Sequence, residues 1–425
     1  AEADGQKAHA QGSIDLRSAD PVMNLNVSAT DFAPQAVLAA IPLNGTVDFA
    51  AHVTGTFKNP GVDGQFSVAH GETEGIVFDN ASCRARLADN LLSVQDLKAD
   101  VFDGKVTGEG ELSLEDFSFA AHVLPQGINA SHAADFVPQA ADFRGFVDGD
   151  LAVNGNLNDI AATSIYGSAS VKSAAFRELP INSIGTSFFV KNGDLFVDYL
   201  SIKMPNHSDI GIEGSLTGGD NVDFNIYGGH VDFAAAKKFA PDIDVEGFGD
   251  FQGSIKGNIK NPQTDLKFVA LRGRAFEQTF DSVKGEFSGN LDELNVKEII
   301  VEKDGKDIWD IAGSVGLTGE KRIDLRADTM GVRCEELAAL VAPDQPVTGN
   351  VDNTIRFTGT LDNPHAVGYV HFYRGSYRGM LLSGMDGDYF VEGDKVRLQD
   401  FHIFSPMVDM DVNGIIDRVT GELNM

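Results

Sequence analysis

Apolar and polar residues alternate along most of this chain. In segment 221–227, Val222, Phe224 and Ile226 are separated by polar residues, and segment 322–328 repeats the pattern. A period of two is typical of β-strands that have one apolar face and one wet face. The sequence therefore predicts an all-β protein.

The predicted strands are roughly 7–12 residues long, with five or six in each ~100-residue stretch. They are separated by dipeptides that favour tight hairpins, namely Asn44-Gly45, Asp103-Gly104, Asn192-Gly193 and Asp304-Gly305. Short hairpins join antiparallel neighbours, so we expect a mainly antiparallel meander.

One turn sequence recurs at a nearly fixed interval. "GTFKNP" begins at Gly55, a copy without proline, "GNLNDI", at Gly155, "GNIKNP" at Gly257, and "GTLDNP" at Gly359, which gives intervals of 100, 102 and 102 residues. Asn-Pro starts a turn and interrupts the strand ladder, because proline has no amide hydrogen to donate. We interpret the motif as structural punctuation, and we expect a looser turn where the proline is missing.

Two further markers follow the same order. Glycines that begin strand-like "GSIDL"-type segments stand at positions 12, 110, 214, 313 and 414, and short Ala-rich segments end at Pro42, Pro138, Pro241 and Pro343. We expect each Ala-rich segment to form one or two helical turns or a crossover, and to act as a packing plug. The markers predict a tail of a preceding repeat at 1–12 and β-groove repeats at 13–110, 111–214, 215–313 and 314–425.

Composition narrows the possible partners. The net charge of −30 argues against nucleic acid, which needs clustered Lys and Arg, and it suits a soluble, self-repelling surface. Phe occurs 29 times against 7 Tyr and 1 Trp, which favours a dry apolar surface. No apolar run reaches the ~18 residues that span a bilayer. The chain begins without Met in the middle of the pattern, so we expect it to be a piece of a longer protein.

A sheet with one apolar face must cover that face, and the sequence offers no sign of a closing barrel or a second sheet. We therefore expect an elongated, curled, mainly antiparallel sheet whose apolar face forms a U-shaped hydrophobic groove, with short helical segments. The candidates for the groove wall, each of which could instead belong to a closed core, are Phe49, Phe66, Phe119, Val153, Phe188, Phe224, Ile226, Phe251, Phe268, Leu325, Ile355 and Phe372.

The Gly-x-φ-x-Asn-Pro turns (φ, an apolar residue), the alternating strands and the ~100-residue units resemble the TamB/AsmA-like family of bacterial envelope proteins, within the repeating β-groove, bridge-like lipid-transfer class. The resemblance covers essentially the whole chain and involves no catalytic motif. It implies a periplasmic protein of two-membrane bacteria that is anchored in the inner membrane, reaches the outer membrane and moves phospholipids along its groove. For some members it also implies an outer-membrane barrel partner in an assembly module.

The sequence offers little support for metal binding or catalysis. Asp409, Asp411, Asn413 and Gly414 have the spacing of the first half of a calcium loop, but Thr420 occupies the position of the bidentate Glu. The histidines, together with Cys83 and Cys334, match no metal-ligand spacing, and no nucleophile or phosphate-binding motif is present. We therefore predict no enzyme, no cofactor and no metal. The alternatives left open are a scaffold for inserting outer-membrane or surface proteins, and a tandem β-sandwich adhesin without a lipid role.

Overall fold

The computed structural model describes the chain except residues 1, 4–5, 18–19, 37–42, 74, 136–140, 239–244, 276–277, 336–345, 418–419, 421 and 425. The described part is all-β with short helical segments, as predicted. Its residues form two compact units. Unit 1 comprises Ala1–Pro205 and Gly211–Gly219, and unit 2 comprises Asn206–Ile210 and Asp220–Met425.

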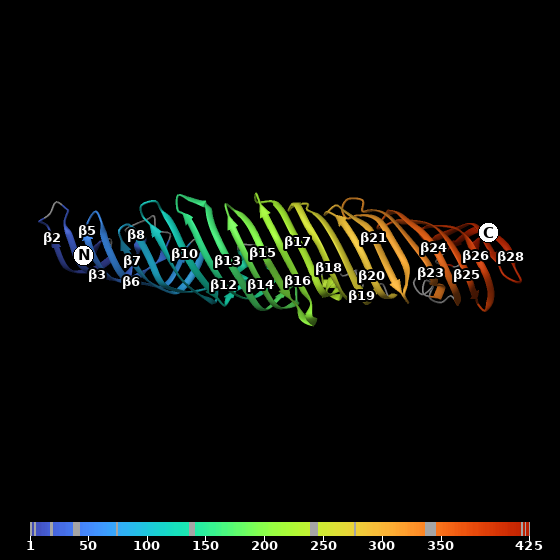
Figure 1. The fold of residues 1–425 in the computed structure, drawn as a ribbon, viewed down its shortest axis with the longest axis horizontal. Helices are drawn as coiled ribbons and strands as arrows, with labels where there is room; N and C mark the ends of the chain where they lie inside the picture. The colour runs from blue at the N-terminus through green and yellow to red at the C-terminus, as the bar shows by residue number, and fades with distance from the viewer. Residues whose placement is uncertain are drawn as a thin grey trace. The chain divides into compact units, whose positions relative to one another are not determined.

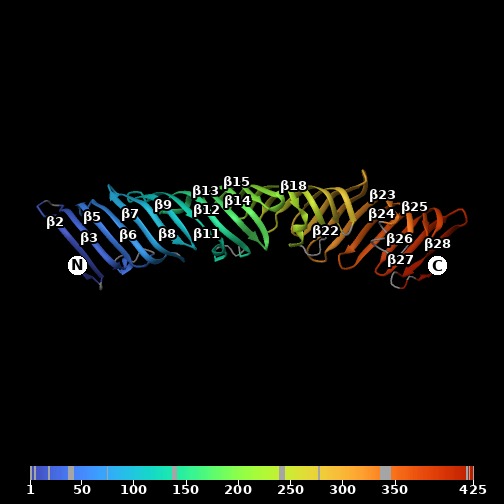
Figure 2. The same ribbon diagram turned by 90° about the horizontal axis from the view of Figure 1, so that it is seen from below.

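In each unit the strands follow one another in chain order (Figures 1 and 2). The elements of unit 1 are β1 (Glu2–Ala3), β2 (Gln6–Asp15), β3 (Val22–Phe32), η1 (Pro34–Ala36), β4 (Asn44–Gly45), β5 (Val47–Thr56), β6 (Pro60–Thr73), β7 (Ile76–Ala88), β8 (Leu91–Val101), β9 (Gly104–Ser113), β10 (Ser118–Gln126), β11 (Ile128–Asn129), η2 (Ala130–Asp135), β12 (Phe143–Asn156), β13 (Asp159–Phe176), β14 (Leu179–Lys191) and β15 (Asp194–Lys203).

Two elements, η4 (Pro205–His207) and β16 (Asp209–Thr217), contain residues of both units. The elements of unit 2 are β17 (Asn221–Asp232), η5 (Phe233–Lys238), β18 (Val245–Asn258), β19 (Gln263–Ala275), β20 (Gln278–Gly289), β21 (Glu293–Lys303), β22 (Lys306–Gly316), β23 (Arg322–Arg333), β24 (Val347–Thr360), β25 (Pro364–Tyr377), β26 (Met380–Glu392), β27 (Lys395–Phe404), β28 (Asp409–Asp417) and β29 (Leu423–Asn424).

Successive long strands pair antiparallel in both units, which confirms the predicted meander. In unit 1 the pairing runs from β2 through β3, β5 to β10 and β12 to β15. In unit 2 it runs from β17 to β28. Among the described strands, neither pairing closes on itself and neither unit has a second sheet packed against the first. This arrangement counts against tandem β-sandwiches, which need two facing sheets.

Consecutive antiparallel strands place their connections alternately at two rims of each unit. We call one the Asn-Pro rim, because it holds turns 57–59, 157–158, 259–262 and 361–363. The other is the helical rim, because it holds η1, η2, η5 and the helical residues 334–335. In unit 1, eight described strands separate η1 from η2, the two-residue strands β4 and β11 and the six longer strands β5 to β10. The number of longer strands is in line with the five or six predicted.

The recurring Gly-x-φ-x-Asn-Pro motif forms a recurring turn. Gly55, Gly257 and Gly359 have φ of +79°, +94° and +95°, a region that suits glycine. The copy without proline is shorter than the others, since only Leu157 and Asn158 separate β12 from β13. The expectation of a looser turn there was therefore wrong, because two residues suffice once proline is absent.

Two other local predictions need correction. Asn192-Gly193 and Asp304-Gly305 do form the two-residue turns between β14 and β15 and between β21 and β22. Asn44-Gly45 instead forms β4 and pairs with β6, so it is no hairpin turn. Many strands also exceed the predicted 12 residues, with 14 in β6 and 18 in β13. In β13, the positive-φ residue Ser173 forms a bulge inside the strand instead of ending it.

A second motif recurs that the sequence analysis missed. Glycines at 45, 145, 247 and 349 are each followed three residues later by an aspartate. The carboxylates of these aspartates accept a backbone N–H from the preceding strand or, for Gly127, from the break between β10 and β11. The distances are 2.8, 2.9, 2.8 and 2.6 Å in the pairs Asp48–Asp31, Asp148–Gly127, Asp250–His230 and Asp352–Gly331. All four donors have positive φ, between 48° and 64°. Each carboxylate therefore holds a bulge at the helical rim.

The aromatic side chains lie over glycines of neighbouring strands. A Cβ built on Gly285 would come within 2.1 Å of the Phe268 ring, one on Gly167 within 2.4 Å of Phe188, and one on Gly228 within 2.3 Å of Phe251. Glycine thus leaves the space in which each ring can lie flat on the sheet. This packing covers backbone without a second layer of secondary structure.

The helical segment η5 packs on the apolar face near the helical rim. Phe233 of η5 contacts Phe268 edge-to-face, with ring centroids 6.3 Å apart. Its ring also lies 2.7 Å from where a Cβ of Gly249 would be. The described part of this segment therefore acts as the packing plug that we expected. Most of the corresponding predicted segments, 37–42, 136–138, 239–241 and 336–343, lie outside the described residues.

We expect Gly285→Ala to destabilise unit 2, since the added methyl displaces Phe268 from its stack on Phe287, where the ring centroids are 5.4 Å apart. Overpacking of this kind costs about 1–3 kcal/mol, measurable as a lower urea midpoint. Gly185→Ala is the matched control, because nothing lies within 4 Å of its Cβ position and its φ is not positive. Equal midpoints for the two variants would contradict the packing role of Gly285.

Candidate functional site

The apolar face of unit 1 is built by cross-strand pairs, because residues directly opposite in an antiparallel ladder point to the same face. Phe49 lies opposite Phe66. The next three strands continue this face at Cys83, Val94 and Leu112.

Leu112 lies opposite Phe119, which is followed by Val153 on β12 and Phe188 on β14. The register thus brings the five candidates of unit 1 to one face.

Unit 2 brings its seven candidates together in the same way. Phe224 lies opposite Ile255, and Ile226 opposite Gly253, while Phe251 lies opposite Phe268. Further along, Leu325 pairs with Gly313 and Phe357, Ile355 with Ala327 and Gly368, and Phe372 with Val351. Each unit therefore presents one apolar face.

Eleven of the twelve candidate side chains are partly exposed, and one is buried. Phe49, Phe224 and the other nine are half-buried, whereas Phe372 is 1% exposed and lies over Gly349 and Gly375. Phe372 is therefore not a wall residue of an open groove but part of a closed core. The half-buried residues retain surface that another molecule can cover.

Aromatic rings contact one another along part of this face, Phe32 and Phe49 edge-to-face and Phe49 and Phe66 stacked. Phe32, Phe49 and Phe66 form a chain with centroid distances of 5.7 and 5.9 Å. Such pairs contribute about 0.5–1.5 kcal/mol beyond area burial. Phe32 was not among the predicted residues, although it ends an alternating segment.

The area of the whole chain agrees with an uncovered face. The chain exposes 25456 Å². Two separate compact units of half its mass would expose about 19,000 Å² in total. The excess is what a single sheet with few covering elements leaves open.

The opposite face carries cross-strand ion pairs. Arg356 donates two hydrogen bonds to Asp324, at 2.8 and 2.7 Å, and hydrogen bonding to Arg356 lowers the pKa of Asp324. Glu286 accepts from Lys297 and Lys267, which lower its pKa in the same way. These pairs are exposed, so each adds little stability. They keep this face wet and charged.

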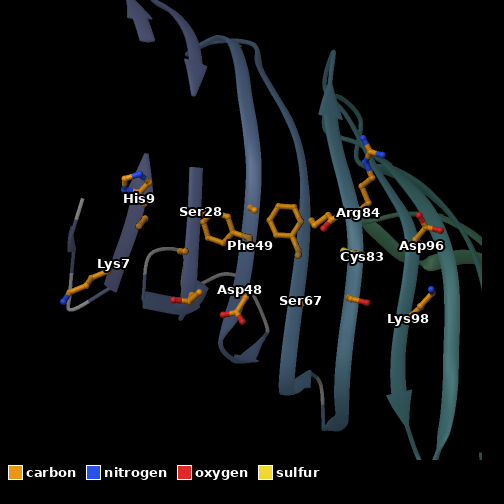
Figure 3. Close-up of a pocket in the computed structure, with 17 residues that line it drawn as sticks. Lys7, His9, Ser28, Asp48, Phe49, Ser67, Cys83, Arg84, Asp96 and Lys98 are labelled. Carbon is orange, nitrogen blue, oxygen red and sulfur yellow. The ribbon is translucent and has the colours of Figure 1, made fainter. Parts of the chain in front are cut away.

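A hollow of about 1350 Å³ in unit 1 lies over β2 to β8. Figure 3 shows Lys7, Asp48 and Lys98 in one row and His9 and Arg84 in another. Phe49 and Phe66 also line it, but they alternate with exposed polar residues that the register assigns to the opposite face. Because the lining is mostly polar, we do not assign this hollow to an apolar ligand.

Sequence reasoning missed one exposed aromatic row on the polar face of unit 1. Tyr166 pairs with Phe189, which pairs with Phe196, and the successive ring centroids are 4.3 and 6.1 Å apart. The doublet Phe188-Phe189 was the available signal, because adjacent residues of a strand point to opposite faces. Only Phe188 belongs to the apolar face.

The structure also bears on the residues that were considered for metal binding. Asp409, Asp411 and Asn413 lie on the extended strand β28, with Asp409 and Asp411 contacting His402, so they form no calcium loop. Cys83 and Cys334 are half-buried free thiols whose pKa is raised by burial. In the described part of the chain, no cluster of three or more His, Cys, Asp or Glu is placed to hold a metal ion.

No helix among the described residues is long and apolar enough to cross a membrane. Comparison of the chain with protein-family models, with curated proteins and with solved structures finds no match. The family resemblance therefore rests on the sequence motifs alone.

We expect Asp411→Asn to lower the pKa of His402. The Nδ1 atom of His402 lies 2.9 Å from the Asp411 carboxylate, and this hydrogen bond, with Asp409 and Asp386 nearby, raises the His402 pKa above 6.5. The stabilisation by protonated His402 is therefore complete below the unfolded pKa and is lost as pH rises through the folded pKa. An NMR titration of the imidazole measures the shift. An unchanged His402 pKa in the variant would contradict this pairing.

Proposed function

We propose that this chain is part of a lipid-transfer protein that shields phospholipid acyl chains on its apolar face during transport between the inner and outer membranes, and so contributes to outer-membrane biogenesis. One observation carries the proposal. In each unit the cross-strand register aligns half-buried Phe, Ile, Leu and Val side chains on one face, and no second described sheet covers them. A monomer normally buries such a surface or uses it.

We further propose that the apolar face curls into a groove built from ~100-residue repeats. Recurring local geometry supports this view, since the positive-φ glycines at 55, 257 and 359 and the aspartates at 48, 148, 250 and 352 recur at that spacing. Repeated bulges and turns increase the twist of a sheet and bend its strands. A curled sheet would enclose acyl chains on more than one side.

The apolar face addresses a large energetic barrier. A phospholipid has ~30 methylenes, and at ~0.8 kcal/mol each their transfer through water costs more than ~20 kcal/mol. An apolar wall removes most of this cost, while the headgroup stays in water. A surface of even affinity gives no direction to movement, so direction must come from other components.

The cellular setting is proposed from the family resemblance. It places the protein in the periplasm of a two-membrane bacterium, held in the inner membrane by a part outside this chain, with an outer-membrane barrel as a partner in assembly. The proposed role is non-enzymatic. The measured lipid content of the purified chain tests the core of the proposal without requiring these partners.

Phe224→Asp is expected to weaken lipid binding about tenfold, because a carboxylate against acyl chains costs at least about 1.4 kcal/mol. Phe224 is half-buried on the apolar face of β17. Uptake of a fluorescent phospholipid from vesicles by the purified chain measures the effect.

Asn225→Asp is the matched control, since it places the same carboxylate one residue further, on the exposed polar face. We expect it to bind lipid like the parent chain. Unfolding midpoints near that of the parent show that both variants are folded. Equal uptake by the two variants would speak against the apolar face as the lipid site.

A further inference from the structure

The Asn-Pro rim carries exposed apolar residues at its turns. The apolar residue of the Gly-x-φ-x-Asn-Pro motif is Phe57, Leu157, Ile259 and Leu361 in its four copies, with exposed fractions of 59%, 50%, 51% and 51%. Other turns of the same rim add Leu114 at 39%, Leu291 at 59% and Leu317 at 43%. Turn residues are usually polar, so this row requires an explanation.

Hydrogen bonds fix the backbone of these turn residues. The backbone N–H of Leu114 donates to the carbonyl of Asn90 at 2.7 Å, and that of Leu157 to Phe117 at 2.9 Å. In unit 2, the N–H of Leu317 donates to Asp292 at 2.7 Å and that of Leu361 to Lys321 at 3.0 Å. Adjacent hairpins are thus joined at their ends. These bonds fix the backbone from which the exposed apolar side chains project.

The turn residues continue the alternation of the apolar face. Leu114 stands two residues after Leu112, and Leu317 two residues after Val315, which pairs with Ile323. Leu361 stands four residues after Phe357, the partner of Leu325. The apolar positions therefore extend to the Asn-Pro rim itself.

The half of the face beside the helical rim is packed differently. In unit 1, Val171, Ala174 and Ile181 are buried and pack with Phe143, Val147, Phe176, Ile184 and Ile202. All lie near the ends of β12 to β15 that meet the helical rim. In unit 2, Ala270, Phe280, Val332 and Phe372 occupy the same side and are at most 7% exposed. Near the Asn-Pro rim of unit 2, Val222, Val296, Ile323 and Ala366 are also buried, at 5–8% exposure, but they stand on β17, β21, β23 and β25, which do not pair with one another.

The charge at the Asn-Pro rim argues against an anionic partner. Asp89, Asp116, Asp292 and Asp362 are exposed in these turns. The basic residues there are Lys58, Lys260 and the neighbouring Lys321 and Arg322, and Arg322 is paired with Glu320 at 2.7 Å. Hydrogen bonds from Ser113 and Ser118 lower the pKa of Asp116 to about 2, so it stays ionised at neutral pH. Phosphate headgroups or an anionic bilayer surface would need several basic residues together. The uncharged part of a lipid fits this row better.

We propose that acyl chains bind in the half of the apolar face next to the Asn-Pro rim, with the exposed turn residues as one wall. The half next to the helical rim is closed protein core. This inference rests on the proposed lipid function and assigns the part of the face that performs it. It applies to β5–β13 and β18–β25, whose turns carry the exposed apolar residues described above. Beyond β25 the exposed Met380, Leu381 and Met407 stand at the helical rim instead.

Strand β22 offers two positions for a test. Trp309 is the single tryptophan of the sequence. It is half-buried near the helical-rim end of β22, and it lies on the same face of the sheet as Ile311. Leu317 follows the other end of the same strand, about 27 Å away. In the native chain, the fluorescence of Trp309 therefore reports on lipid bound near the helical rim. Leu317→Trp in a Trp309→Phe background reports from the Asn-Pro rim, and Ser314→Trp in that background is the control on the polar face.

Each protein is incubated with phosphatidylcholine vesicles whose acyl chains carry bromine, which quenches nearby tryptophan, and is then separated from them. Bound lipid is determined by phosphate assay. We expect a several-fold larger fractional quenching for Leu317→Trp than for native Trp309, and none for Ser314→Trp. Quenching of Trp309 equal to or above that of Leu317→Trp would overturn the assignment. Bound lipid that quenches neither reporter would overturn it as well, while leaving the lipid function intact.

Absence of lipid phosphate from every protein, the native chain included, would instead remove the proposed function and this inference with it. A Leu317→Trp variant that loses its cooperative unfolding transition is replaced by Leu361→Trp, at the corresponding exposed turn of β24–β25. The fractional quenching of Leu361→Trp is then compared with that of native Trp309, and the same two outcomes support or overturn the assignment.

Discussion

The structure depends on antiparallel register between strands with a two-residue side-chain period. A slip of one residue would move every apolar side chain of a strand to the polar face. Phe251 therefore has to meet Phe268, and Gly313 has to meet Leu325, for either face to exist. The short turns at the Asn-Pro rim and the aspartate-held bulges at the helical rim keep that register.

Glycines on neighbouring strands make room for the aromatic rings of the apolar face. Rings such as Phe188 and Phe268 lie flat over Gly167 and Gly285, so aromatic surface covers backbone that a second sheet would otherwise cover. The rings remain half-buried as a result. A sheet of this kind can be stable while keeping an apolar surface available, and the proposed lipid function uses that surface.

The sequence predicted what local patterns determine. Alternation at Val222, Phe224 and Ile226 gave the correct faces, and Asn192-Gly193 gave a correct hairpin. The aspartate series beginning with Asp48 was missed, because its acceptor role requires a bulge on another strand. Phe224 and Phe372 follow the same pattern but differ in burial, because Phe372 lies beside the helical rim, where the core closes. Distance from a rim is a tertiary property that alternation does not encode.

The central claim is that the apolar face binds phospholipid. Native mass spectrometry of the purified chain, expressed in a two-membrane bacterium and never exposed to detergent, tests it most directly. The account predicts mass increments of whole phospholipids on the folded chain, and these disappear after organic extraction. A spectrum with the bare chain mass alone, unchanged after incubation with phospholipid vesicles, would contradict it.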